Sequence, residues 1–467
     1  MKRLKEFIPE KLRLFDVLWL GVPVAIWFAY QPLIRLGQDG TMYYELSVTM
    51  LYAALLALVS LPSIWRHRHE LVKLRAAWVV EVFVVISLLG LMWTMNLTRG
   101  ILTAGVTGML YGIFLGAMAE RVRLKQLLPS IVRVYLYSAL VMCGLAIVQF
   151  FAGLWLDAQT TLLCAGCVAE QFGFVRPNVF LIEPQFLGSA LLPAVLLLTY
   201  RGVTGQKDWR VFVGLFVVVT VLVLTLSRGA LAAGAVGVVL LVALYAKNVQ
   251  RWMAVVGIFT ASLVGALVLQ GTAAVMNPAI DETFGGAVTK SIHQLTMGIV
   301  DIRSTRAEPE QTDPVVPQET NQPHFDGYVE ESTDARTTRT SLALQRWNVD
   351  APTMLFGVGI GSAGLAMHEM FPNKIGAREI VQNEYVETLL ERGLVGLVSF
   401  LAVLGALFVA TKQQKWLWSI IAAFMVQWLF FSGYPNALHV YLALILIATY
   451  SRSGSGSASA TSLRRRG

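Results

Sequence analysis

The sequence is poor in charged residues. Only 14% of its 467 residues are charged and 56% are hydrophobic, whereas about a quarter of the residues of a soluble domain are usually charged. This shortage excludes an ordinary soluble domain and indicates a membrane protein. The formal net charge is +8, but the basic residues lie in short runs between apolar blocks, as topology signals do. We therefore expect no nucleic-acid partner.

Cysteine is also scarce. Three cysteines in the whole chain are too few for a disulfide scaffold. Cys164 and Cys167 form a CAGC pair, for which a local disulfide is the favoured interpretation if the segment lies outside the cell. A metal site is disfavoured because no second pair of ligands follows at a suitable spacing. We expect neither a metal ion nor another cofactor.

Apolar blocks of about 17 to 25 residues mark membrane crossings. They predict an all-α polytopic membrane protein with about twelve transmembrane helices, near residues 15–33, 42–62, 77–97, 100–119, 130–152, 185–200, 211–226, 230–246, 252–271, 393–410, 416–432 and 437–450. No small-residue cleavage site follows the first block, so we expect it to be retained.

Basic residues alternate between the connecting segments. One set of segments holds most lysines and arginines, and the short segments of the other set hold little beyond Arg35, Arg99, Arg176 and Arg228. Because basic loops stay inside, we expect cytoplasmic termini, with residues 1–14 as a short start and 451–467 as a flexible tail.

Two outer segments are too long to be simple turns. Residues 153–183 interrupt the first nine helices (15–271), and a large periplasmic loop at 272–392 precedes the last three helices (393–450). Within the large loop, residues 307–335 include four prolines and eight acidic residues but no basic one. Such a segment buries too little apolar area to offset its ordering, so we predict a disordered insert.

A single arginine divides the longest apolar run. From Val211 to Ala246 the only charge is Arg228, and a break at this residue leaves helices of 16 and 17 residues on its two sides. Arg228 then lies at the outer membrane surface, because a charge at the bilayer centre costs about 3 kcal/mol. It is either an interfacial anchor or part of a binding site.

Other polar residues fall on the same predicted side. Arg176 precedes Pro177, and Glu183 precedes Pro184 at the start of a span, where a carboxylate suits the helix dipole even as a simple cap. After the insert, a helical segment places its arginines seven residues apart on one face. These are Arg339 and Arg346, flanked by Arg336.

The last part of the large loop has two further motifs. The glycines of FGVGIGSAG permit close backbone approach, and a packing turn is favoured over a phosphate loop. A predicted helix ending at Gly393 then carries three acidic residues at helical spacing, which line a site or face solvent: Glu384, Glu387 and Glu391. Because the planar fork of arginine suits diphosphate oxygens, arginines between apolar helices predict a lipid diphosphate ligand.

The order of these features resembles that of the O-antigen ligase and polysaccharide polymerase superfamily. The resemblance is carried by Arg176 with Pro184, by LSRGA between two spans, and by a long outer loop that closes with RW, GVGIG and Asn383 ahead of Gly393. It covers roughly Gln171 to Gly433.

This resemblance implies a GT-C-like, metal-independent glycosyltransferase of the bacterial inner membrane. Its glycan donor would be an undecaprenyl-diphosphate-linked oligosaccharide, used at the periplasmic face in the lipid bilayer for exopolysaccharide biosynthesis, with a chain-length regulator protein as a partner. Arg176, Arg228 and Arg339 would bind the diphosphate. Arg346, Gln382, Asn383 and Glu384 would complete the substrate site.

One position departs from the family pattern. Gln382 stands where the ligase branch has a histidine, and glutamine cannot accept a proton at neutral pH. We therefore expect Glu183 to be the general base, with Glu384 and His368 as weaker candidates. The departure favours a polymerase over an O-antigen ligase, which would transfer the glycan to lipid A core or another acceptor.

A secondary transporter or a lipid-linked glycan flippase is the alternative from another class. Such proteins usually show inverted repeats and interrupted helices at the midplane, and the sequence shows neither. The charges within its predicted spans, Glu81 and Arg133, fall near inner ends.

Overall fold

The computed structural model describes residues 12–29, 33–39, 42–153, 169–171, 174–181, 183–205, 208–245, 249–276, 283–295, 328–377, 379–432 and 437–450. Seven helices in these ranges are long and apolar enough to cross a membrane. They are α3 (Val48–Arg66), α6 (Leu97–Ala119), α7 (Arg121–Ala152), α8 (Pro184–Thr204), α10 (Arg228–Tyr245), α11 (Val249–Met276) and α16 (Glu384–Ala410).

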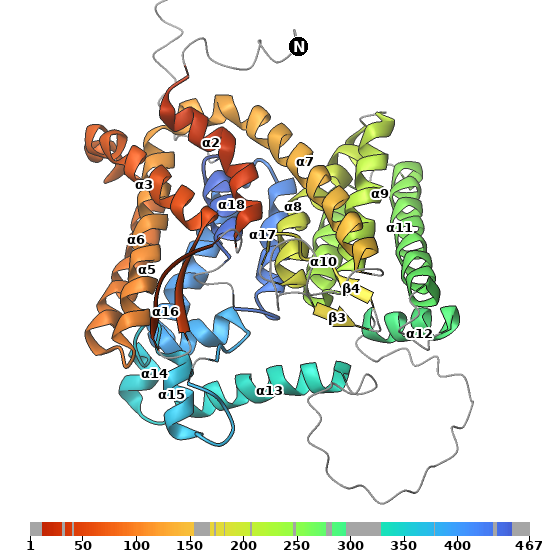
Figure 1. The fold of residues 1–467 in the computed structure, drawn as a ribbon. Helices are drawn as coiled ribbons and strands as arrows, with labels where there is room; N and C mark the ends of the chain where they lie inside the picture. Colours follow the sequence, from red (N-terminus) through yellow and green to blue (C-terminus); the bar gives the residue numbers. More distant parts are fainter. Residues whose placement is uncertain are drawn as a thin grey trace, which may run out of the picture.

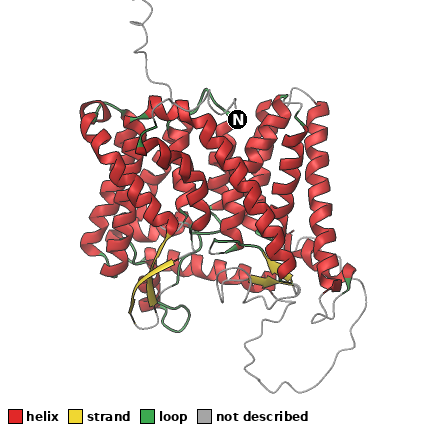
Figure 2. Cartoon of the chain, turned by 45° about the horizontal axis from the view of Figure 1, so that its top comes forward, coloured by secondary structure: helices red, strands yellow, loops and turns green. Residues whose placement is uncertain are grey.

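Five shorter apolar helices complete the bundle, in which most helices run side by side (Figures 1 and 2). They are α2 (Leu14–Ala25) with the 3-10 turn η1 (Ile26–Phe28), α5 (Arg75–Leu89) with η2 (Gly90–Trp93), α9 (Trp209–Leu224), α17 (Trp416–Gln427) and α18 (Leu438–Ala448). Each of the twelve overlaps one predicted span. The predicted all-α polytopic membrane fold is confirmed.

Two predicted spans have different bounds in the structure. The first helical stretch stops at Phe28, and the second begins only at Val48, because the residues between contribute to a hairpin of β1 (Leu33–Asp39) and β2 (Met42–Ser47). Ser47 sets the new start, since its hydroxyl accepts a hydrogen bond from the Met50 amide at 3.2 Å and caps α3. A second hairpin joins β3 (Ala169–Gln171) to β4 (Phe174–Arg176). Cys164 and Cys167 lie outside the described residues.

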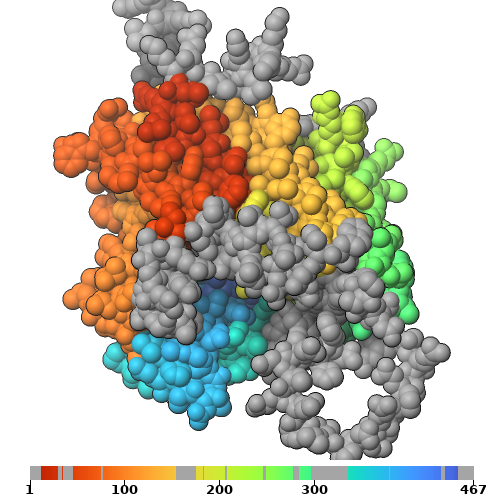
Figure 3. All heavy atoms as spheres, viewed as in Figure 1, coloured from red at the N-terminus to blue at the C-terminus, as the bar shows by residue number. Residues whose placement is uncertain are grey.

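Four helices lie at one end of the bundle (Figure 1). They are α12 (Phe284–Leu295), α13 (Tyr328–Trp347), α14 (Ala351–Phe356) and α15 (Ala363–Met370). The light-blue part of this layer forms a lobe at the lower end of the surface in Figure 3. Because α13 begins at Tyr328, the last eight residues of the segment predicted to be disordered are helical; residues 307–327 lie outside the described part.

The segments predicted to be cytoplasmic meet at the opposite end. Arg13, His67 and Arg121 line one polar cavity of about 420 Å³. Beside it, Arg123 forms an ion pair with Asp16, whose side chain is buried. Three of the segments predicted to be cytoplasmic therefore lie together at the end of the bundle opposite the α12–α15 layer (Figure 1).

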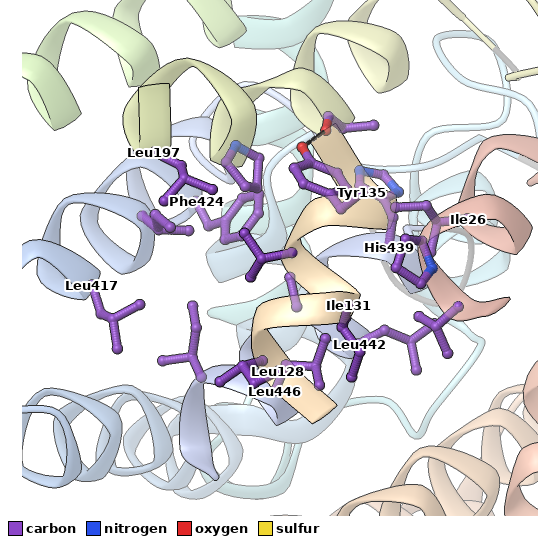
Figure 4. Close-up of a pocket in the computed structure, with 18 of the residues that line it drawn as sticks. Ile26, Leu128, Ile131, Tyr135, Leu197, Leu417, Phe424, His439, Leu442 and Leu446 are labelled. Carbon is purple, nitrogen blue, oxygen red and sulfur yellow. Dashed lines mark hydrogen bonds between the residues drawn. The ribbon is translucent and has the colours of Figure 1, made fainter. Parts of the chain in front are cut away.

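Helix α8 is the most buried of the long helices. Close approach of α10 requires glycine, because a Cβ on Gly188 would meet the Ala230 Cβ at 2.7 Å, and small residues are typical of such membrane interfaces. An apolar cavity of about 110 Å³ lies between α2, α7, α8, α17 and α18 (Figure 4). The Tyr135 hydroxyl on its wall donates to the Ala190 carbonyl at 2.5 Å, and His439 Nε2 lies 2.9 Å from Ser189 Oγ.

Candidate active site

Three arginines from distant parts of the chain converge at the end of the bundle that carries α13. Arg176 of β4, Arg228 at the start of α10 and Arg336 of α13 all line one small pocket. Arg228 and Arg336 also line an adjacent cavity of about 700 Å³. Arg176 and Arg228, which the sequence analysis assigned to one site, are therefore brought together.

The turn between α9 and α10 presents Arg228. Leu226 in this turn has φ 48°, a left-handed backbone that is unfavourable for a leucine. Arg176 holds the turn by donating from Nε to the Thr225 carbonyl at 2.9 Å and from Nη2 to the Leu226 carbonyl at 3.4 Å. Arg228 itself is 7% exposed and stands at the amino end of α10, where the helix dipole favours an anion.

The opposite wall of the larger cavity comes from the segment before α16. Gln382 has φ 59°, and its side-chain oxygen accepts a hydrogen bond from Arg336 Nε at 3.3 Å. Asn383 caps α16, because its Oδ1 accepts from the amides of Tyr385 at 3.1 Å and Val386 at 3.2 Å. Both Gln382 and Asn383 line the cavity, and their contact with substrate stays a prediction. Left-handed non-glycine residues thus occur in two walls of one site, where backbone strain is often functional.

Helix α13 contributes Arg336 rather than the two arginines chosen from the sequence. Arg339 and Arg346 do share a face, but at roughly 100° per residue it points away from the centre of the cavity wall around Thr340 and Leu344. Arg336 lies at the border between that face and the cavity wall. Arg339 Nη2 instead forms an ion pair with Glu379 Oε2 at 2.8 Å. The described residues that line the two pockets include neither Arg339 nor Arg346.

Glu183 lies beside the small pocket. It occupies the cap position of α8, with Pro184 as the first helical residue, as predicted. Its side chain is exposed, and Oε2 accepts from Gln185 Nε2 at 2.6 Å. Gln185 also lines the pocket. Its hydrogen bond therefore connects the Glu183 carboxylate to the pocket that the arginines line.

The other base candidates occupy different surroundings. Glu384 is 4% exposed and accepts from the Tyr441 hydroxyl at 3.2 Å. His368 lies on α15, and its ring nitrogen Nδ1 is 2.7 Å from the Ile375 carbonyl. Neither residue is among those described as lining the two arginine pockets.

Two acidic residues of α16 are buried rather than solvated. Glu387 Oε2 accepts from the Val381 amide at 3.4 Å, next to Gln382. Glu391 Oε2 pairs with Arg392 Nη1 at 3.3 Å, and its Oε1 accepts from the Ala363 amide at 3.4 Å. These contacts hold the segment before α16 and the start of α15 against α16. They therefore help to position the cavity wall.

The glycine motif is a packing turn, as predicted. Helix α16 breaks at Gly393, which has φ 65° and ψ −169°, a backbone region that is essentially restricted to glycine. The break frees carbonyl groups of the preceding turn, and the glycine motif satisfies two of them. The Val358 amide donates to the Leu390 carbonyl at 2.9 Å and the Gly359 amide to the Glu391 carbonyl at 3.0 Å.

The fold and the site define a polytopic α-helical membrane protein with an arginine cluster at one end of its bundle. The family model described as O-antigen ligase matches residues 213–401. This match covers less than half of the chain and supports the resemblance to the O-antigen ligase and polymerase superfamily. A search of curated proteins found no match.

The matched segment is shorter than the region of predicted resemblance. It includes Arg228, Arg336 and Gln382, whereas Arg176 and Glu183 precede it. The tertiary structure connects the two parts, since Arg176 is hydrogen-bonded to the turn that carries Arg228. The geometry, and not the family match, therefore connects Arg176 to the site.

Proposed function

We propose that this protein is a polysaccharide polymerase. It transfers a growing glycan from undecaprenyl diphosphate to a sugar hydroxyl of a lipid-linked repeat unit. The observation that carries the proposal is the convergence of Arg176, Arg228 and Arg336 on one pocket beside a cavity of about 700 Å³. Guanidinium groups are suited to diphosphate oxygens, and the cavity has room for a sugar next to them.

In the proposed reaction, the bond between the anomeric carbon and the diphosphate oxygen breaks, and its electron pair leaves with the diphosphate. The acceptor hydroxyl oxygen forms the new glycosidic bond and loses its proton to the Glu183 carboxylate. Arg176, Arg228 and Arg336 stabilise the negative charge that develops on the leaving group. The buried position of Arg228 strengthens this effect, because charges interact more strongly away from water.

The preference for a polymerase over a ligase rests on the residue at 382. The Gln382 side chain accepts from Arg336 at 3.3 Å and has no basic nitrogen. Proton removal therefore falls to Glu183, beside the small pocket. We place the site on the periplasmic face of the inner membrane and both termini in the cytoplasm, because the basic segments gather at the other end of the bundle. A chain-length regulator is the proposed protein partner.

Arg228→Ala tests the role of the cluster. In lipid nanodiscs with a lipid-linked repeat unit, we expect the variant to extend chains about 100- to 1000-fold more slowly, the cost of one electrostatic donor in a transition state. Arg210→Ala is the matched control, because Arg210 lies at the far end of α9 and is exposed. Equal rates for Arg228→Ala and the wild type would refute the proposal.

The acceptor separates the two activities. The same preparation is offered a lipid-linked repeat unit or a lipid A core, each with the same donor. Longer lipid-linked chains support the polymerase, whereas transfer to the core alone assigns the protein to the ligases. Glu183→Gln is expected to abolish either transfer while leaving donor binding intact, and full turnover would remove Glu183 from the base position.

A further inference from the structure

Helix α12 contributes an amide side chain to the arginine pocket. Gln294 lies near the end of this helix and lines the small pocket together with Arg176, Arg228 and Arg336. The helix lies at the foot of α11, on the side of the α12–α15 layer near β3 and β4 (Figure 1). Its buried face consists of Ala287, Ser291 and Gln294, which are spaced at helical intervals.

The amide of Gln294 is buried without a full set of partners. The residue is 2% exposed, and its Oε1 accepts no hydrogen bond from the described residues. Buried polar atoms are nearly always paired. A buried, unpaired amide oxygen at a pocket lined by three arginines therefore points to a group supplied by the ligand.

The chemistry of the amide restricts that group. The diphosphate of a sugar-bearing lipid is esterified at both ends, carries no proton at the pH of the cell and so cannot donate to an amide oxygen. A sugar hydroxyl and an acetamido N–H both can donate. The guanidinium groups already supply the positive charge that the diphosphate requires. The small pocket is narrow, with a cavity volume of about 30 Å³ against about 700 Å³ for the adjacent cavity, so it admits a substituent of a sugar rather than the ring.

We propose that Gln294 is a specificity-determining residue that recognises a hydroxyl or acetamido group on the sugar nearest the diphosphate. The inference rests on the proposed function, because it assumes a lipid diphosphate in the adjacent cavity. It assigns different parts of the ligand to the two groups: the arginines bind the diphosphate, and the amide of Gln294 on α12 recognises the sugar. The substrate class is a polyprenyl diphosphate with a hydrogen-bond donor on its first sugar.

Binding of two kinds of probe tests this division. The wild type and Gln294→Leu are compared in nanodiscs for affinity to undecaprenyl diphosphate and to undecaprenyl diphosphate carrying glucose, galactose or N-acetylglucosamine. For the wild type, at least one sugar should strengthen binding relative to the sugar-free lipid. The variant should lose that gain, about 10-fold for one hydrogen bond to a neutral group, and should bind the sugar-free lipid as the wild type does.

Gln270→Leu is the matched control. Gln270 of α11 is equally buried and both of its amide atoms lack partners among the described residues, but it is not among the residues described as lining the arginine pocket. This variant should keep the wild-type gain for the preferred sugar. Retention of the melting midpoint by Gln294→Leu would show that helix α12 remains folded.

Three results would overturn the inference. They are an equal loss of affinity for the sugar-free and the sugar-bearing lipids, unchanged binding of every probe by Gln294→Leu, and a wild type that gains nothing from any sugar. Failure of the proposed function has a different signature, because the wild type would then fail to bind undecaprenyl diphosphate at all.

Discussion

Replacing Gly393 with alanine tests how the kink in α16 supports the site. At φ 65° and ψ −169° an alanine is strained by about 1–3 kcal/mol. Its Cβ would also lie 2.2 Å from the Leu355 carbonyl carbon, so the backbone of α14 must move. Alanine recovers at most about 1 kcal/mol of helix propensity over glycine, so we expect a net loss of stability.

Gly405→Ala supplies the comparison within the same helix. A Cβ at Gly405 would meet nothing within 4 Å, so this variant should gain up to about 1 kcal/mol. With the recovered propensity subtracted, the two alanine variants should differ by about 1–3 kcal/mol before any cost of the clash with Leu355. Gly393→Ala should be the less stable in thermal unfolding followed by tryptophan fluorescence in detergent. Chain extension should also slow in Gly393→Ala, because the strained segment at Gln382 is held by the first half of α16. Equal melting midpoints for the two variants would show that an alanine at position 393 is not strained.

Three further predictions concern charged groups. Arg336→Ala should weaken binding of undecaprenyl diphosphate by about 10- to 100-fold, since a hydrogen bond to a charged group is worth about 1.5–3 kcal/mol. Arg339→Ala, which loses only the ion pair with Glu379, should change it less than 5-fold (about 1 kcal/mol); the reverse order in a titration would favour the sequence-based assignment. Arg123→Ala should destabilise the fold by about 3–5 kcal/mol, because the buried Asp16 carboxylate loses its ion pair. The double variant with Asp16→Ala should recover part of that loss in denaturant unfolding, and additive losses would refute the coupling.

The bundle could be predicted because apolar length is a strong and local signal. Each predicted crossing overlaps a helix, and the charge alternation separates the two ends of the bundle. The hairpin at residues 33–47 was missed because residues 42–47 directly precede an apolar run and were counted as its first turns, and hydropathy alone does not distinguish a strand from a helix. The kink at Gly393 was predicted, since a glycine between an acidic helix and an apolar run ends one and starts the other.

The site was predicted in part for a physical reason. Arg176 and Arg228 adjoin a proline or a glycine at the ends of predicted spans, so local sequence places them at one membrane surface. Gln382 and Asn383 were found only through the resemblance to the family. Gln294 has no such marker. A glutamine on a short amphipathic helix is ordinary, and only its buried, unpaired oxygen beside the arginines indicates a role.

Helix α13 shows what periodicity alone does not determine. Seven-residue spacing correctly predicts that Arg339 and Arg346 share a face, but it does not say which way that face points. Orientation is set by packing, and the buried Leu342 and Ala343 sit on a different side of the helix from Thr340 and Leu344, which line the cavity. Placing those two apolar residues against the protein turns Arg336 toward Gln382 and Arg339 toward Glu379. Which arginine faces the cavity thus depends on which apolar residues the helix buries. The sequence alone does not identify these residues, because their burial depends on the positions of the neighbouring elements.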